Sequence, residues 1–221
     1  MDVIIKDYNN ASNIINNKYS GEWAEINDVL NKMRLQLKAS DQAGKIGTAI
    51  FDPVGTNASI KTSLCALNWD ANKAIPETYK FLGTDIDFVK SGMIVEVQFS
   101  NYPFLLNNLL RSELFYKAGT IFTNAATDLL VIVTKCHVLP ASNSTLYYEQ
   151  AQKQLDALSE HNVFDIPIRL VGLKSPYSES VPSLWTTYED PRYSRTVILE
   201  ESIDVKVKKG TAKKSRAIIT R

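Results

Sequence analysis

Carboxylate and amide side chains are concentrated in residues 84–101, TDIDFVKSGMIVEVQFSN. Asp87 and Glu96 each alternate with apolar residues, as expected of two strands, and residues 90–92 between them have turn character. If the strands pair across this turn, the two carboxylates converge. Adjacent carboxylates repel each other and cannot both stay charged without a cation. Mg²⁺ meets this need, because it binds carboxylates, carbonyls and waters, and phosphate oxygens complete its shell.

Two other interpretations of this stretch are open on the residues alone. The acidic residues are equally compatible with the outward face of an edge hairpin. A pair of carboxylates also serves glycoside hydrolases, but these enzymes line their clefts with tryptophan, and Trp23, Trp69 and Trp185 are scattered along the chain. Because side chains of a strand point alternately to its two faces, Glu96 and Gln98 are expected to lie on the same face.

Composition narrows the class of protein. The chain has 221 residues, of which 44% are hydrophobic and 22% charged, as in globular proteins and unlike disordered or fibrous ones. No run of about 18 apolar residues exists and the N-terminus lacks a long apolar segment, so we expect neither a membrane span nor a signal peptide. Cys65 and Cys136 lie in apolar settings, which favours two packed thiols in a reduced intracellular protein.

Charge is distributed unevenly despite a net value of +1. The segment from Lys206 to Arg221 contains seven basic residues and no acidic one. Such a tail is compatible with an arm for a polyanion and, equally, with a solvated terminus.

Apolar spacing predicts a mixed α/β fold. We expect helices at 21–38, around 57–67, at 103–117 and from the polar loop 142–145 to about 160, buried strands at 129–134 and 168–173, a short strand at 2–7, a turn at 52–57 and a loop at 68–80. The order strand–helix–strand through 129–173 implies a right-handed parallel crossover. After residue 176 the pattern changes to short strands and turns, which indicates a β-rich subdomain.

The wider sequence resembles a known enzyme family. Asp87, eight intervening residues and then Glu96-Val97-Gln98 resemble the D…ExK site of restriction-endonuclease-like nucleases, with glutamine where lysine is usual. The blocks FLGTDIDF, VEVQFSNYPFLLNN, RSELF, PASNS, LYYEQAQ, VFDIPIRLVGL and RYSRT, in this order, resemble type II restriction endonucleases of the BglII family. The resemblance covers roughly residues 38–196.

The resemblance implies one endonuclease domain with an α/β fold. Its restriction-endonuclease-like core, mainly 1–175, has a central mixed sheet flanked by helices, and a smaller β-rich subdomain, mainly 176–221, clasps double-stranded DNA. The implied enzyme is a cytoplasmic bacterial homodimer that cuts the palindrome AGATCT after the first A and leaves four-base 5′ overhangs. A two-fold dimer presents identical surfaces to both strands. A cognate DNA methyltransferase is its functional partner.

Site roles also follow from the resemblance. Asp87 and the main-chain carbonyl of Val97 are expected to bind Mg²⁺, while Glu96 and Gln98 hold the attacking water. Because Gln98 is neutral, it lacks the positive charge that lysine lends. Either Asn72 or Lys73 matches a family asparagine near the metal water, and the sequence leaves that choice open.

Candidate DNA contacts come from polar residues that read base edges or phosphates. They are Ser100, Asn101, Asn107, Asn108, Arg111, Asn143, Ser144, Asp190, Arg192, Tyr193 and Arg195. Each has a simpler interpretation, such as a helix N-cap for Asn143 or Ser144 and a solvated helix position for Arg111. Two alternatives to a specific nuclease are a DNA-binding protein of this fold without efficient turnover and a less specific nuclease.

Overall fold

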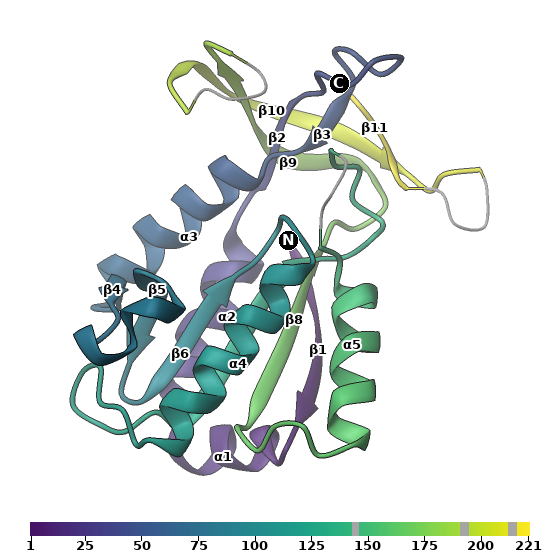
Figure 1. Cartoon of the computed structure of the whole chain (residues 1–221). Coiled ribbons are helices and arrows are strands. Elements are labelled where there is room, and N and C mark those ends of the chain that lie inside the picture. The colour runs from purple at the N-terminus through teal and green to yellow at the C-terminus, as the bar shows by residue number, and fades with distance from the viewer. Residues whose placement is uncertain (143–145, 191–194, 212–215) are drawn as a thin grey trace.

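The computed structural model describes residues 1–142, 146–190, 195–211 and 216–221, which form two sheets (Figure 1). The first sheet has the strand order β1-β8-β7-β6-β5-β4. Its strands are β1 (Asp2–Tyr8), β4 (Asp70–Ala74), β5 (Asp85–Lys90), β6 (Met93–Val97), β7 (Leu129–Lys135) and β8 (Ile168–Lys174). β6, β7 and β8 are parallel, and the other neighbours are antiparallel, so the sheet is mixed.

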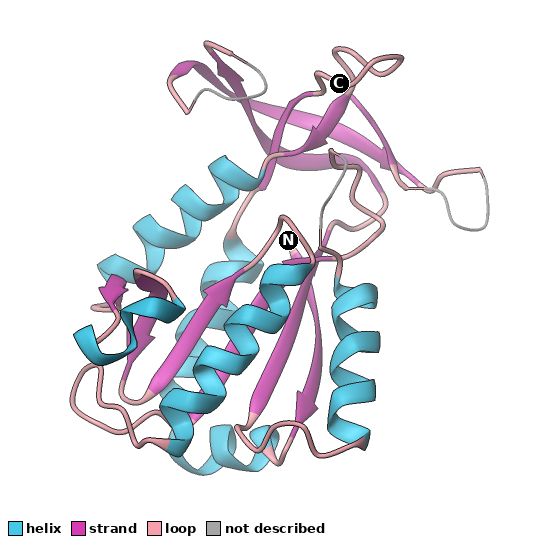
Figure 2. Ribbon diagram, viewed as in Figure 1, coloured by secondary structure: helices cyan, strands magenta, loops and turns pink. Residues whose placement is uncertain are grey.

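Helices cover both faces of this sheet (Figure 2). The helices are α1 (Ala11–Lys18), α2 (Ser20–Lys32), α3 (Pro53–Ala66), α4 (Pro103–Lys117) and α5 (Tyr148–Glu160), and a 3₁₀ helix, η1, spans Glu77–Leu82. All seven residues of β7 are buried. Val131 and Val133 join the core beneath α1 and α2, and Leu130 and Ile132 join the core beneath α4 and α5. A continuous apolar strand is therefore what a doubly covered sheet requires.

The second sheet has the order β11-β10-β9-β2-β3 and lies beyond the end of the first (Figure 1). Its strands are β2 (Leu35–Ala39), β3 (Ala49–Phe51), β9 (Ser178–Tyr188), β10 (Val197–Lys208) and β11 (Ile218–Thr220). β2 runs parallel to β9, with Leu35 opposite Ser183. The predicted β-rich subdomain, mainly 176–221, does not include β2 and β3, which come from the N-terminal half of the chain.

Most of the predicted elements are confirmed, including the 103–117 helix, the buried strands at 129–134 and 168–173 and their parallel pairing. The predicted helix at 21–38 is wrong beyond Lys32. Met33 has an extended backbone, and Leu35 and Leu37 are buried in β2 instead. Leucines at this spacing suit either period, and pairing with distant β9 decides between them.

Two further predictions need correction. Residues 52–57 are not a turn, because Asp52 caps α3 and Pro53 is its first residue. The Asp52 carboxylate accepts a hydrogen bond from the Val54 amide at 3.1 Å. The segment 68–80 is not a loop either, since it contains β4 and the start of η1. Short polar strands lack the apolar alternation that would reveal them.

The described helices do not combine the length and apolar composition that a bilayer crossing requires. Both cysteines are free thiols, as expected. Cys136 is buried, whereas Cys65 is exposed, so only one of the two is packed as predicted.

Candidate active site

A tight hairpin brings the predicted carboxylates together. β5 and β6 pair antiparallel, with Phe88 opposite Val95 and Lys90 opposite Met93. Ser91 and Gly92 connect them, both with positive φ (52° and 90°), the backbone of a two-residue turn that matches strand twist. One residue beyond the paired Phe88 and Val95, Asp87 lies close enough for its charge to act on Glu96 and for its carboxylate to accept a hydrogen bond from the Val97 amide. The predicted convergence of the two carboxylates across this turn is therefore confirmed.

The environment of both carboxylates opposes their ionisation. Glu96 is only 2% exposed, and burial raises its pKa to about 8, with the Asp87 charge acting in the same direction and Arg111 against it. Burial is also the main cause that raises the pKa of Asp87, although the Val97 amide donates to its carboxylate at 2.7 Å. Two acidic groups held close in a poorly hydrated site are a place where a divalent cation is stabilised.

Arg111 supplies the fixed positive charge of the site. Its Nη2 lies 2.6 Å from Glu96 Oε1, and both side chains are buried. A glycine makes room for the guanidinium, since a Cβ at Gly83 would lie 2.7 Å from Arg111 Nη1. Arg111 of α4 thus supplies a positive charge to the site, where neutral Gln98 supplies none.

The simpler interpretation of Arg111 as a solvated helix residue is wrong, because its side chain is buried against Glu96. The DNA contact of Arg111 stays a prediction. Asn108 is also buried, while Asn107 is exposed. The inward face of α4 comprises Leu105, Asn108, Leu109, Arg111, Ser112 and Phe115. Helical periodicity would have placed Asn108 and Arg111 on this face, had the polar residues been counted with the apolar ones.

Gln98 lies just beyond the end of β6. Its amide N–H donates to the carbonyl of Val133 at 2.8 Å, which continues the pairing with β7. Its side-chain amide donates to the carbonyl of Ser100, and so turns toward the following segment. Gln98 is half-buried at the rim of the site.

The neighbouring strand β4 distinguishes Asn72 from Lys73. The Asn72 side chain donates to Asp85 at 3.3 Å and accepts from Lys61 Nζ of α3 at 2.6 Å. Lys73 instead pairs with Asp70 at 2.9 Å. The charge of Lys61 lowers the pKa of Asp87, although by less than burial raises it. Asn72 is therefore the residue whose side chain is tied to the catalytic hairpin.

The remaining DNA-contact predictions fall in two groups. Ser100, Asn101 and Arg195 are exposed, and so is Asp190, which has an interaction partner. Asn143, Ser144, Arg192 and Tyr193 lie outside the described residues. The interpretation of Asn143 or Ser144 as a helix cap is wrong, because Tyr147 occupies the N-cap of α5.

The donor set suits a hard cation that keeps part of its water shell. The described residues hold no cluster of three or more acidic, histidine or cysteine side chains of the kind that would enclose a metal. Asp87 and Glu96 provide carboxylate oxygens, and burial, the main cause of their raised pKa values, penalises their charged forms and so favours a cation beside them. Magnesium sites with one or two carboxylates and several waters have this composition.

Comparisons with known proteins place this site in an enzyme family. Residues 3–173 match the family described as restriction endonuclease BglII/BglIII. The type II restriction enzyme BglII of Bacillus subtilis is 53% identical over 207 residues, which cover 94% of this chain and 92% of the relative.

Solved structures of BglII are also similar to this chain. The crystal structure of restriction endonuclease BglII complexed with a DNA 16-mer has a TM-score of 0.94 at 50% identity, covering 100% of this chain and 99% of that one. Free BglII gives a TM-score of 0.77 at 47% identity over the same shares. The present structure thus has an arrangement closer to that of the DNA complex.

Fold, site and matches together define a restriction endonuclease, a DNA-binding nuclease of a class that depends on a divalent metal. More particularly, the chain belongs to the BglII/BglIII restriction endonuclease family and is a type II restriction enzyme that cleaves DNA site-specifically.

Proposed function

We propose that the protein is a Mg²⁺-dependent homodimer that cleaves the palindrome AGATCT after its first A and leaves four-base 5′ overhangs. The observation that carries the chemistry is the closeness of Asp87 to Glu96 beside the paired strands β5 and β6, with Arg111 against Glu96. The proposed recognition sequence rests on the similarity to BglII along most of the chain.

Asp87 holds the metal in this mechanism, together with the main-chain carbonyl of Val97. When bound, Mg²⁺ lowers the pKa of water and offsets negative charge on the phosphate in the transition state. The Val97 amide fixes the Asp87 carboxylate by a hydrogen bond of 2.7 Å, which leaves its other oxygen for the cation. The hairpin thus orients the Asp87 carboxylate before a cation binds.

Glu96 and Gln98 orient the attacking water toward the phosphorus. Glu96 acts in its ionised form, and Arg111 favours that form by pairing with it at 2.6 Å. Gln98 contributes hydrogen bonds without charge. Asn72 lies on the neighbouring strand and, through Asp85, adds a second polar group beside the metal water.

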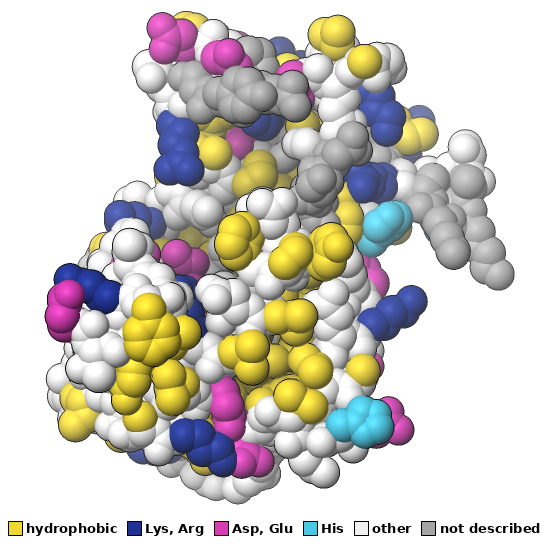
Figure 3. Space-filling model, viewed as in Figure 1, with side chains coloured by type: hydrophobic (Ala, Val, Ile, Leu, Met, Phe, Trp, Pro, Cys, Tyr) yellow, Lys and Arg dark blue, Asp and Glu magenta, His cyan; other side chains and the backbone are white. Residues whose placement is uncertain are grey.

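Helix α4 provides a surface for a second copy of the chain. Leu106, Leu110 and Leu114 recur every fourth residue and are 40%, 58% and 36% exposed. Phe104, on the same helix, is 50% exposed. Hydrophobic side chains gather over this helix on the visible face of the molecule (Figure 3). A contiguous apolar patch of this kind marks an interface. A palindrome requires a two-fold dimer, so we assign the patch to the partner subunit.

Base reading is assigned to Ser100 and Asn101, directly after the catalytic strand, and to Asn143 and Ser144. Asn107, Asp190, Arg192, Tyr193 and Arg195 complete the proposed DNA surface. The proposed setting is the bacterial cytoplasm, where a cognate methyltransferase would protect host sites.

The test uses purified protein, unmethylated phage DNA and sequencing of the cleaved ends. Discrete fragments ending in 5′-GATC are expected with Mg²⁺ and none with EDTA. Asp87→Ala should abolish cleavage, and Asp28→Ala serves as the matched control, because Asp28 is an exposed carboxylate paired with Lys32 on α2. A smear of fragments would support the less specific nuclease, and binding without cuts would support the DNA-binding alternative.

A further inference from the structure

Lys135, the last residue of β7, is completely buried and has no part in the proposed mechanism. Its Nζ donates to the carbonyl oxygen of Phe99 at 2.7 Å and to that of Leu146 at 3.1 Å. The Thr134 hydroxyl donates to the same Leu146 carbonyl at 3.3 Å. A lysine is rarely buried, because removing its amine from water is costly unless the amine is hydrogen-bonded. The two carbonyls provide that compensation.

Three aromatic rings surround the same amine. Lys135 Nζ lies 4.8 Å from the ring centroid of Tyr147, 5.6 Å from that of Phe51 and 5.8 Å from that of Phe99. Phe51 belongs to β3 of the second sheet, whereas Lys135 belongs to the first. The amine therefore lies where the two sheets meet and contacts residues of both.

The hydrogen bonds do not depend on the charge of Lys135. Burial lowers its pKa to about 7, and the positive charge of Arg216 acts in the same direction. A neutral amine still has two N–H donors, as many as the carbonyls that it contacts. Both contacts are consequently available on either side of neutral pH.

The two carbonyls belong to segments with separate tasks. Phe99 lies between Gln98 of the active site and the proposed base-reading residues Ser100 and Asn101. Leu146 immediately follows the polar loop 142–145. The amine thus ties the segment after the catalytic strand to Leu146.

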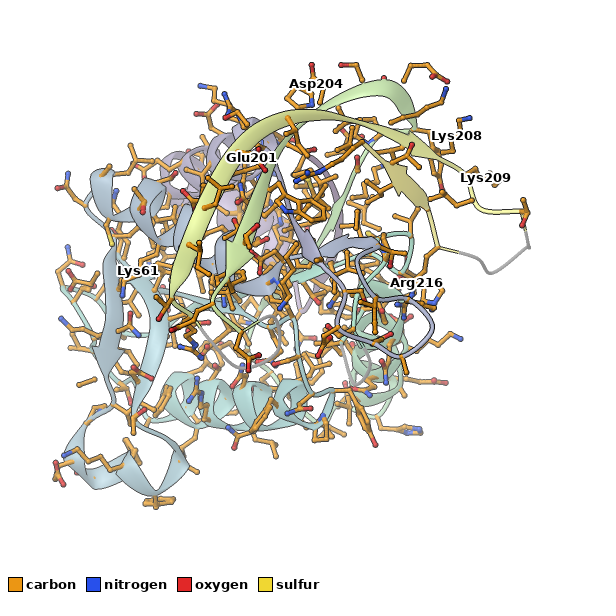
Figure 4. The ribbon with its side chains drawn as sticks, turned by 90° about the horizontal axis from the view of Figure 1, so that it is seen from above. Lys61, Glu201, Asp204, Lys208, Lys209 and Arg216 are labelled. Carbon is orange, nitrogen blue, oxygen red and sulfur yellow. The ribbon has the colours of Figure 1, made fainter. Side chains whose placement is uncertain are left out.

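Arg216 contacts Ala141, which precedes residues 142–145 in the sequence. Its Nη1 donates to the carbonyl of Ala141 at 2.6 Å, and its guanidinium lies 5.0 Å from the Tyr147 ring centroid. Seen from above, Arg216 lies on the segment that returns to β11, away from Lys208 and Lys209 at the end of β10 (Figure 4). Arg216, one residue of the basic tail, therefore contacts both Ala141 and Tyr147.

We propose that Lys135 and Arg216 are positioning residues for sequence discrimination, which hold Leu146 and Ala141 in place relative to the end of the catalytic strand. The proposed base-reading residues Asn143 and Ser144 lie between Ala141 and Leu146 in the sequence, and Ser100 and Asn101 follow Phe99. This inference rests on the proposed function, because it requires that these two segments read bases. In this arrangement a wrong base pair displaces one segment and, through the Lys135 amine, misaligns the other. Sequence reading and cleavage are thus coupled by main-chain contacts rather than by a direct contact of Lys135 with DNA.

The test compares kcat/KM on oligonucleotides that contain AGATCT and on the same oligonucleotides with one outer base pair changed. Lys135→Met keeps an unbranched apolar chain and removes the donors. It is expected to lower the ratio of the two kcat/KM values by on the order of tenfold, within the range that one base contact provides. Arg216→Met, at a partly exposed position, should lower the ratio by a smaller factor.

Arg169→Met is the matched control, because Arg169 is a buried cation on adjacent β8 that pairs with Asp7 away from this loop. It should reduce thermal stability and leave the ratio unchanged. An unchanged ratio in Lys135→Met would overturn the inference, even if overall activity fell. If Lys135→Met does not fold, Arg216→Met decides, and an unchanged ratio there has the same consequence. Cleavage of AGATCT by the parent enzyme tests the proposed function separately.

Discussion

Arg111 and Glu96 form a buried ion pair of 2.6 Å between helix α4 and the catalytic strand β6. The same helix carries the exposed leucines assigned to the dimer interface on its other face. The group that holds Glu96 in place is therefore attached to the element on which the partner subunit would pack. The proposed dimer contact and the orientation of Glu96 therefore both depend on the position of α4.

Arg111→Met should shift the pH dependence of cleavage upward. Burial already raises the pKa of Glu96 to about 8, and the guanidinium opposes that rise. Because Glu96 acts in its ionised form, activity increases as pH passes its pKa, and loss of the cation moves this increase to higher pH. A shift of about one pH unit corresponds to roughly 1.4 kcal/mol of lost pairing.

The measurement is kcat/KM against pH at saturating Mg²⁺. Arg111→Lys keeps the charge and should restore part of the profile, whereas Arg169→Met should reproduce the parent curve. Superimposable profiles for Arg111→Met and the parent would show that the pair does not govern the ionisation of Glu96.

Metal binding should release protons. The pKa of Glu96 is raised to about 8, so part of its metal-free population is protonated near neutral pH. A divalent cation held by Asp87 favours the ionised form of the neighbouring Glu96 and displaces its proton. Affinity for Mg²⁺ alone should consequently rise between about pH 6.5 and pH 8.5, the window below and around the raised pKa of Glu96.

Calorimetry at pH 7.5 in two buffers with different ionisation enthalpies measures this release directly. We expect the apparent enthalpies to differ by an amount that corresponds to about one proton. Glu96→Gln should remove most of the difference. Equal enthalpies for the parent protein would contradict the prediction.

Leu110→Glu should separate the dimer. Leu110 is 58% exposed in the single chain, and its burial against a partner would contribute about 1.5–3 kcal/mol for each copy. A carboxylate at this position would place an unpaired charge in the proposed apolar interface of each copy, which is costly. Sedimentation should show a monomer, and cleavage should fall with it. Ile5→Glu, at an exposed apolar position on edge strand β1, is the control that should stay dimeric.

Loss of Asp7 should cost more stability than loss of its partner. Arg169 Nε and Nη2 donate to the two Asp7 oxygens at 2.8 and 2.7 Å, and the guanidinium lies 4.3 Å from the Trp23 ring centroid. Asp7→Ala leaves a buried cation unpaired and should lower the free energy of unfolding by roughly 2–4 kcal/mol. Arg169→Met leaves a carboxylate that water reaches and should cost about half as much. Urea unfolding of both variants checks this order.

The catalytic hairpin was predictable because its contacts are local. Period-two alternation and a short turn are enough to bring Asp87 and Glu96 together at the end of the paired strands β5 and β6. The boundary between α2 and β2 was not, since Leu35 and Leu37 suit a helix as well as a strand until β9 pairs beside them. The role of Arg111 depends on how α4 packs, which local spacing indicates only when buried polar residues are counted with apolar ones.

The pairing of β1 with β8 and of β2 with β9 has a consequence during synthesis. Asp2 pairs with Lys174 and Leu35 with Ser183. The N-terminal strands β1 and β2 therefore cannot pair until β8 and β9, near the C-terminus, have been synthesised. Contacts of such long sequence separation also slow folding. The hairpin with the acidic residues can form early, but both sheets are complete only when translation is nearly finished. A nascent or truncated chain that lacks β8 and β9 is therefore expected to have no nuclease activity, although it already contains Asp87 and Glu96.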